Sequence, residues 1–203
     1  MLVVYDFEGD TTIPVVERLQ TEMAWVRLHR NDLGRGALNA VKAGFAAARA
    51  PYVLVTMADL SDDPADIEPM LAVASKVDAD VVAASRYMTG GRQVGGPFVK
   101  RTLSRIAGLS LHYVAGVPTH DPTNNFKLYS RRLLDQVEIE SEAGFELALE
   151  LTVKAHLKGM RIAEVPTTWR DRSVGESRFQ MRKWIPHYLR WYGMGMLGRL
   201  KRS

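Results

Sequence analysis

Short apolar runs alternate with longer amphipathic stretches along the first 86 residues of the chain. Runs rich in Val, Leu and aromatic residues predict strands, and stretches whose apolar residues recur every three to four positions predict helices. The expected strands cover residues 2–5, 24–29, 51–57 and 79–86, and the expected helices cover residues 11–23, 34–49 and 64–77. This alternating order predicts an α/β fold with a mostly parallel sheet flanked by helices.

The second half of the chain follows a looser order. Its pattern predicts a Gly-rich loop at 89–97, helices at 99–116, 131–137 and 144–159, and strands at 126–130 and 161–170, the last with a bend at Pro166. The sequence contains no internal repeat and no sign of a second domain boundary. We therefore expect one domain over residues 1–178, followed by a basic amphipathic tail over residues 179–203.

An acidic segment, MADLSDDP, follows the third expected strand. Its carboxylates Asp59, Asp62 and Asp63 repel one another unless a cation or hydrogen-bond donors offset the charge. Capping of the next helix accounts for Asp62 or Asp63, and solvation at the surface is the alternative for Asp59. Ligands of parallel sheets bind at the carboxyl ends of the strands, where Asp59 is expected beside Asp6 and Arg86. Carboxylates at such an edge suit Mg²⁺ or Mn²⁺ shared with substrate phosphates.

Two other groups of charged residues have both a surface interpretation and a functional one. Arg86 follows a strand and either pairs with a phosphate or stays solvated. Glu146, Glu150, Lys154 and Lys158 recur at four-residue spacing on one expected helix. On the residues alone, a solvated face with i,i+4 ion pairs is the favoured interpretation of that helix.

Composition narrows the class of protein. The chain has 203 residues and a net charge of +4. It contains no cysteine, which excludes disulfides and thiolate chemistry. The basic character belongs to residues 170–203, which carry +7, whereas residues 1–169 carry −3. There is no GxGxxG, GxxxxGK[ST] or HExxH motif, and no run approaches the roughly 20 apolar residues of a spanning helix.

Five segments, in order, resemble glycosyltransferase family 2, and more narrowly its dolichyl- or polyprenyl-phosphate sugar transferases. MADLSDDP is similar to the metal-binding DxD segment, and ASRY to the family's GSRY. The others are RNDLGRGALNAVKAGFAAARAPYVLV, HDPTNNFKLYSRRLL and the block from GFELALEL to GESRF. The resemblance covers about residues 1–183 and implies a GT-A-type, Rossmann-like fold.

The resemblance implies an inverting enzyme that moves a sugar from a nucleotide-sugar, of GDP-mannose or UDP-glucose type, to a polyprenyl phosphate, with Mg²⁺ or Mn²⁺. The implied catalytic residues are Asp59, Arg86 and Glu150. The implied donor contacts are Asp6, Asp59 and Arg86, and the implied metal ligands are Asp59 and Asp62. The implied contacts to the acceptor phosphate are Lys127, Arg172, Ser177 and Arg178.

The sequence also departs from the family pattern. Met57 stands where the family has the first Asp of DxD, and the two alternatives are that Asp62 compensates or that the metal affinity is weaker. Asn125 and Arg178 replace a usual Gly and Lys. The chain begins at what resembles the family's second strand, so we expect an N-terminally truncated fold. Its sheet would then be interrupted between 2–5 and 51–57, and each buried unpaired backbone group would cost about 1–3 kcal/mol.

The tail interleaves aromatic and apolar residues with Lys and Arg. This composition suits a helix lying on an anionic membrane surface, and packing on the domain's own core is the alternative. We expect a peripheral protein on the cytoplasmic face of a membrane, of undetermined oligomeric state. Two rival hypotheses are a catalytically inert relative that binds lipid phosphate or a partner chain, and a nucleic-acid-binding protein. The second leaves MADLSDDP and SRY unexplained, so we expect no nucleic-acid partner.

Overall fold

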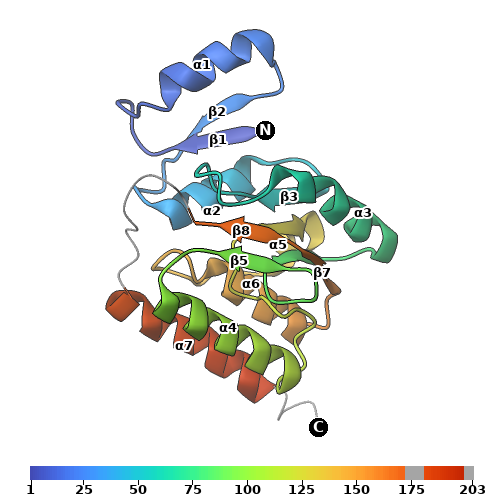
Figure 1. Ribbon diagram of the computed structural model, residues 1–203. Coiled ribbons are helices and arrows are strands. Elements are labelled where there is room, and N and C mark those ends of the chain that lie inside the picture. The colour runs from blue at the N-terminus through green and yellow to red at the C-terminus, as the bar shows by residue number, and fades with distance from the viewer. Residues whose placement is uncertain (172–180, 199–203) are drawn as a thin grey trace.

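The computed structural model of the protein describes residues 1–171 and 181–198 (Figure 1). The strands are β1 (Leu2–Tyr5), β2 (Arg27–Arg30), β3 (Tyr52–Val55), β4 (Val81–Ser85), β5 (Arg92–Val94), β6 (Lys127–Ser130), β7 (Ile162–Pro166) and β8 (Thr168–Arg170). The helices are α1 (Ile13–Glu22), α2 (Ala37–Ala47), the 3-10 turn η1 (Pro64–Asp66), α3 (Ile67–Val77), α4 (Phe98–Tyr113), α5 (Arg131–Gln136), α6 (Leu147–Leu157) and α7 (Met181–Gly198).

The central sheet has the strand order β3-β6-β4-β7. β4 and β7 run parallel, and β6 is inserted antiparallel to both β3 and β4, with Ala83 opposite Lys127. Because β6 runs the other way, its first residues and the loop before it lie at the edge where β3 and β4 end. The α/β class and the helices on both faces are as predicted (Figure 1).

The sheet is interrupted between β1 and β3, as the sequence led us to expect. β1 pairs in parallel with β2 in a separate two-stranded sheet, and within residues 1–171 no pairing joins β1 to β3. Both strands are apolar, yet their residues are only half-buried. Helix α2 spans the two sheets: its Phe45 packs in the central core, and a Cβ at Gly44 would lie 3.5 Å from Val4.

Helix α6 lies inside the molecule, between the sheet and the α4–α7 layer (Figure 1). Its residues Leu149 and Val153 pack against Trp191 of α7, and Leu147 and Leu151 pack against the sheet. The solvated face favoured by the charge spacing is therefore wrong, since Glu146 and Glu150 are fully buried.

The strand predicted at 161–170 does bend at Pro166. β7 ends there and continues the central sheet, whereas β8 turns away and pairs with β5. β5 lies within the Gly-rich segment 89–97, which the sequence predicted as a loop. The β5–β8 pair holds this segment above the carboxyl ends of β4 and β7 through the bond from Arg92 N–H to Thr167 O, at 2.8 Å.

Helix α7, within the tail, packs on the domain's own core. Trp191 is buried, and Tyr188, Tyr192, Met194 and Met196 lie against the same cluster. Between residues 184 and 198, the large apolar side chains that remain exposed are Ile185, Leu189 and Leu197. Within residues 1–171 and 181–198, none of the helices is both long and apolar enough to cross a bilayer.

Two helical glycines predict opposite responses to alanine. A Cβ at Gly108 would run into the carbonyl oxygen of His120, whereas a Cβ at Gly193 would meet nothing within 4 Å. We expect Gly108→Ala to destabilise the protein by about 1–3 kcal/mol through overpacking. Gly193→Ala should stabilise it by about 0.5–1 kcal/mol, the usual helical gain. Urea unfolding of both variants measures the difference, and equal effects would show that α4 does not press on the 119–125 loop.

Candidate active site

The acidic segment forms a tight turn at the carboxyl end of β3. Asp59 Oδ1 accepts a hydrogen bond from the Ser61 N–H at 3.1 Å, and Ser61 O accepts one from Arg170 N–H at 3.0 Å. Leu60 sits at the tip with φ 60°, a left-handed conformation that is unfavourable for a leucine, and its side chain is 88% exposed. A strained, exposed turn anchored to β8 is typical of a functional loop.

The two predicted metal ligands differ in what they offer. Asp62 is buried and turns back on the strand, where its Oδ2 accepts hydrogen bonds from the Thr56 hydroxyl at 3.1 Å and the Met57 N–H at 3.2 Å. Burial, with the nearby charge of Asp59, raises the pKa of Asp62 in spite of these two bonds. Asp59 is half-buried, and no described residue donates a hydrogen bond to its Oδ2, so it is the better placed ligand for a cation.

This donor set fits a cation held mainly by its substrate. No group of three or more His, Asp or Glu side chains suited to a metal occurs in the described ranges. Mg²⁺ is commonly held by one or two carboxylates together with substrate phosphates. Asp59 satisfies that minimum, and the thioether of Met57 adds no hard oxygen.

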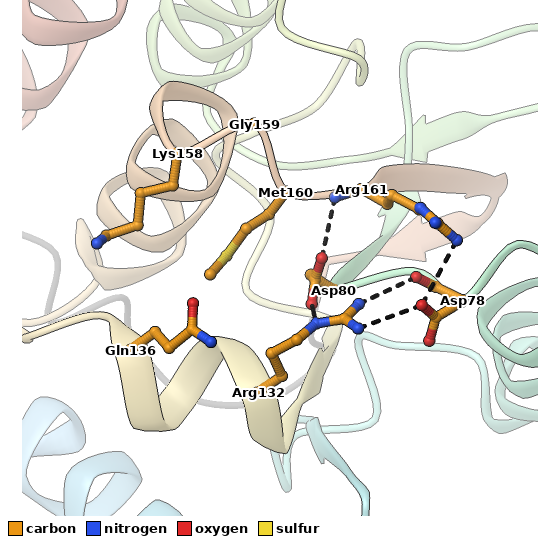
Figure 2. A pocket seen from close by; sticks show the side chains of 8 residues that line it. All are labelled: Asp78, Asp80, Arg132, Gln136, Lys158, Gly159, Met160 and Arg161. Carbon is orange, nitrogen blue, oxygen red and sulfur yellow. Dashed lines mark hydrogen bonds and ion pairs between the residues drawn. The ribbon is translucent and has the colours of Figure 1, made fainter.

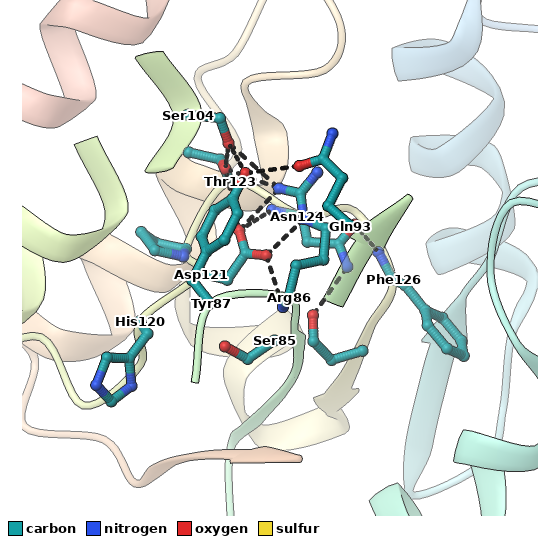
Figure 3. Close-up of polar contacts among 12 residues, drawn as sticks. Ser85, Arg86, Tyr87, Gln93, Ser104, His120, Asp121, Thr123, Asn124 and Phe126 are labelled. Atoms are coloured by element: carbon teal, nitrogen blue, oxygen red, sulfur yellow. Dashed lines mark hydrogen bonds and ion pairs between the residues drawn. The ribbon is translucent and has the colours of Figure 1, made fainter. Parts of the chain in front are cut away.

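A buried ion pair lies at the end of β4 (Figure 3), near enough to the acidic turn for the charge of Arg86 to act on Asp62. Arg86 donates from Nε to Asp121 Oδ2 at 2.6 Å and from Nη2 to Asp121 Oδ1 at 2.9 Å, and its backbone N–H adds a third bond at 3.1 Å. Asp121 is fully buried and comes from the loop before β6. The geometry is a bidentate guanidinium–carboxylate pair, which fixes the plane of Arg86.

Hydroxyl groups from three segments surround the pair (Figure 3). Arg86 Nη2 also reaches Ser104 of α4 at 3.2 Å and Thr123 at 3.3 Å. Tyr87 donates or accepts at Ser104, 3.0 Å away, and bonds Gln93 of β5 at 3.0 Å. Sequence reasoning missed these residues, because their partners are brought together only by the fold.

The charges of the pair support each other. Burial alone would raise the pKa of Asp121, but the positive charge and hydrogen bonds of Arg86 outweigh it and hold the pKa below its ordinary value. Burial likewise opposes the charge on Arg86, and Asp121 more than compensates, so the pKa of Arg86 rises. No described residue accepts a hydrogen bond from Arg86 Nη1, and the side chain is 10% exposed, so Nη1 is the guanidinium nitrogen left for an anion. The expected contact of Arg86 with the nucleotide-sugar is therefore restricted to this nitrogen.

Lys127 does not face a binding surface. Its ammonium is fully buried and donates to the backbone carbonyls of Asp121 at 3.1 Å and Pro122 at 3.2 Å, and to that of Asn124. Burial lowers its pKa to about 7, against the opposing attraction of Asp121. The expected contact of Lys127 with an acceptor phosphate is therefore corrected: the side chain shapes the loop that carries Asp121.

The expected catalytic role of Glu150 is also corrected. Its Oε1 and Oε2 accept the N–H groups of Glu140 at 2.6 Å and Ser141 at 2.8 Å, and Lys154 pairs with it at 2.7 Å. Both oxygens are used and the side chain is fully buried, so the geometry assigns Glu150 to the loop between α5 and α6 rather than to catalysis.

Asp6 lies at the end of β1, as expected for a strand-end carboxylate. Its Oδ1 accepts from Asn31 Nδ2 at 2.8 Å and its Oδ2 accepts from the Gly36 N–H at 2.9 Å. These bonds hold the 31–36 turn before α2, in which Gly36 has φ 128°. Arg172, Ser177 and Arg178, the other expected phosphate contacts, lie outside the described residues.

A separate cavity of about 390 Å³ opens at the opposite edge of the sheet, where β4 begins (Figure 2). Arg132 and Arg161 converge there on Asp78 and Asp80. Asp80 is buried and also accepts from the Ser130 hydroxyl at 2.9 Å. These bonds join the starts of β4, α5 and β7, and none of the predicted site residues lines this cavity.

The Arg86–Asp121 pair predicts a large loss of stability when one partner is removed. Asp121→Asn leaves a buried guanidinium without its counter-ion, which should lower the free energy of unfolding by about 3–5 kcal/mol. Glu8→Gln, which breaks the exposed pair with Arg30 at 2.9 Å, should change it by less than about 1 kcal/mol. Urea unfolding of the two variants compares the losses of stability, and similar losses would contradict the role of Asp121 as the buried counter-ion of Arg86.

The burial of Lys127 should make the stability of the protein depend on pH. Its pKa is about 7 in the folded protein and about 10.4 when unfolded, so between these values the unfolded chain binds the extra proton. Stability should then rise with pH, by about 1–3 kcal/mol from pH 7 to pH 9, relative to Lys127→Met. Parallel stability curves for the two proteins would show that the lysine stays charged in the fold.

Solved structures with the same fold extend over almost the whole chain. Glucosyl-3-phosphoglycerate synthase from Mycobacterium tuberculosis, in complex with Mn²⁺, UDP-glucose and phosphoglyceric acid, aligns with a TM-score of 0.60 at 15% identity, covering 98% of this chain and 67% of that one. The same enzyme with Mg²⁺ and UDP aligns with a TM-score of 0.60 at 18% identity, over 98% and 67%. At this identity the likeness establishes the GT-A fold alone.

Two curated relatives are similar to this chain in sequence, at higher identity than these structures. Polyprenol monophosphomannose synthase of Mycolicibacterium smegmatis is 28% identical over 100% of this chain and 78% of its own length. Dolichol-phosphate mannosyltransferase of Pyrococcus furiosus is 29% identical over 94% of this chain, which spans only 53% of that protein. The family model described as glycosyl transferase family 2 matches residues 1–138, which include the acidic turn, Arg86 and Asp121. The chain therefore belongs to glycosyltransferase family 2.

Proposed function

We propose that the protein transfers a hexose, with inversion, from a nucleotide-sugar to a polyprenyl phosphate. The observation that carries the proposal is that β3 and β4, both antiparallel to β6, end at the same edge of the sheet. The acidic turn that holds Asp59 and the fixed cation Arg86 follow these two strands, and the charge of Arg86 acts on Asp62 of that turn. A carboxylate that binds a cation and a guanidinium that meets an anion are both suited to a diphosphate. The names of the two relatives, a polyprenol monophosphomannose synthase and a dolichol-phosphate mannosyltransferase, support mannose as the sugar and a polyprenyl phosphate as the acceptor.

The donor would lie along this edge, between the two sheets. Asp6 supports the 31–36 turn on the β1 side, and Asp59 and Arg86 follow β3 and β4 along the chain. Both GDP-mannose and UDP-glucose remain candidate donors, because the residues that would read the base are not among the assigned positions. Asp59, with diphosphate oxygens, would hold Mg²⁺ or Mn²⁺, and the ion supplies charge stabilisation for the leaving diphosphate.

The chain's own residues need supply little acid–base chemistry. The acceptor phosphate is already anionic, so its oxygen can attack the anomeric carbon from the face opposite the nucleotide without a strong base. The new bond joins that oxygen to the anomeric carbon as the bond to the diphosphate breaks, and the negative charge moves to the diphosphate. Arg86 is preorganised for this charge, because Asp121, Ser104 and Thr123 fix its guanidinium before substrate arrives.

The acceptor places the enzyme at a membrane. We infer peripheral attachment on the cytoplasmic side, to which residues 179–203 contribute basic charge and the exposed Ile185, Leu189 and Leu197 contribute apolar surface. The acceptor phosphate would be met by Arg172, Ser177 and Arg178, as the family resemblance implies. A catalytically inert relative that binds lipid phosphate remains the rival, motivated by Met57 in place of an acidic ligand.

Substitution of one carboxylate in the turn tests the proposal. The purified protein is incubated with polyprenyl phosphate, Mg²⁺ or Mn²⁺, and radiolabelled GDP-mannose or UDP-glucose, and the labelled lipid is extracted. Asp59→Ala should reduce transfer by at least about 100-fold because the diphosphate loses its cation. Asp63→Ala is the matched control: its carboxylate caps η1 through the Ala65 N–H, so it should keep activity near that of the unchanged protein.

Each outcome has a distinct meaning. Transfer by the unchanged protein and by Asp63→Ala, but not by Asp59→Ala, supports the assignment. Undiminished transfer by Asp59→Ala refutes the role of this residue. Lack of transfer with every donor, while the protein still binds polyprenyl phosphate, would favour the inert relative.

A further inference from the structure

Helix α4 exposes an apolar arc along its whole outer face. Its inner residues Ser104, Gly108 and Leu111 face the domain, whereas the opposite arc carries large apolar side chains that are 48–70% exposed. We define the outer face of α4 as Phe98, Val99, Leu103, Ile106, Tyr113 and the adjoining Val114. An apolar stripe this continuous is unusual on the surface of a soluble domain and marks a contact with another phase or partner.

The charged side chains of α4 and α7 themselves are all basic, and the neighbouring acidic residue Glu140 pairs with Arg190 of α7. α4 contains Lys100, Arg101 and Arg105 and no Asp or Glu, and these cations flank the apolar arc in the helical repeat. α7 lies beside α4 in the same layer, joined by the Ser110–Tyr192 hydroxyl contact at 3.0 Å, and it too contains no acidic residue (Figure 1). The two helices therefore contribute exposed apolar side chains, and every charged residue that they contain is basic.

We propose that the outer face of α4 docks onto an anionic phospholipid surface, with its apolar side chains at the boundary of headgroups and acyl chains. An amphipathic helix with Lys and Arg beside an apolar face binds in this way. A second copy of the chain is a poorer match, because two copies of this face would bring like charges together. The inference deepens the proposed function by naming the surface through which the enzyme meets its membrane, and it rests on that function for its purpose.

The position of α4 ties the docking surface to the active site. On its inner side Ser104 bonds Arg86 and Tyr87, and Gly108 lies against the carbonyl of His120 in the loop that carries Asp121. A helix with its side chains is about 10 Å thick. Docking of the outer face would therefore hold the Arg86 network about one helix diameter from the lipid headgroups, where a polyprenyl phosphate presents its anionic end.

The absence of cysteine allows each surface to be labelled separately. Single-cysteine variants Ile106→Cys on α4, Leu189→Cys on α7 and Leu71→Cys on α3 place an environment-sensitive fluorophore at sites that are all at least 45% exposed. The probes are phosphatidylcholine vesicles with and without phosphatidylglycerol, in the absence of any sugar donor. We expect emission at 106 to shift to shorter wavelength with the anionic vesicles, and emission at 71 to stay unchanged.

A charge reversal adds a second readout. Arg105→Glu should weaken binding to anionic vesicles by about ten-fold or more, whereas Lys76→Glu on α3 is the matched control and should leave it unchanged. If the vesicles shift the emission of the label at 189 while the label at 106 keeps the emission it has in water, the proposal is overturned, and the tail alone binds the membrane. Burial of the 106 label in a lipid-free dimer would overturn it in favour of a second copy. Vesicle binding needs no turnover, so failure here leaves the proposed transfer reaction to be judged by its own assay.

Discussion

The buried ion pair between Arg86 and Asp121 is the interaction on which the candidate site depends. It joins the end of β4 to the loop before β6, and Ser104 and Thr123 close around it. A charge taken out of water is tolerated only when its partner is held in good geometry, so this network imposes a single arrangement on three segments. The fixed cation that results is the feature a diphosphate or phosphate substrate would use.

The acidic turn is best understood in relation to that cation. Asp62 stabilises the fold, since its carboxylate ties the end of β3 to its own turn. Asp59 is available to a ligand, since its Oδ2 accepts no hydrogen bond from the part of the chain that the structure describes. The two aspartates therefore divide a role that the spacing suggested they share. Leu60, with φ 60°, forms the tip of the turn between them.

The alternation of apolar runs was enough to predict the helices and strands up to residue 86, because each of these elements forms its own periodic pattern. The β5–β8 pair was missed, since its strands are three residues long and meet only through the bend at Pro166. Asp121 was missed because its partner lies 35 residues away. Glu150 was predicted on a solvated face, yet α6 is enclosed by α7, and no local pattern announces such long-range packing.

A crystal of the protein grown with a nucleoside diphosphate and Mn²⁺ tests the central claim directly, because manganese is located by its anomalous scattering. We predict an anomalous peak within coordination distance of Asp59, with the diphosphate extending toward Nη1 of Arg86. A manganese ion bound elsewhere, or a diphosphate bound with Asp59 and Arg86 both unengaged, would contradict it.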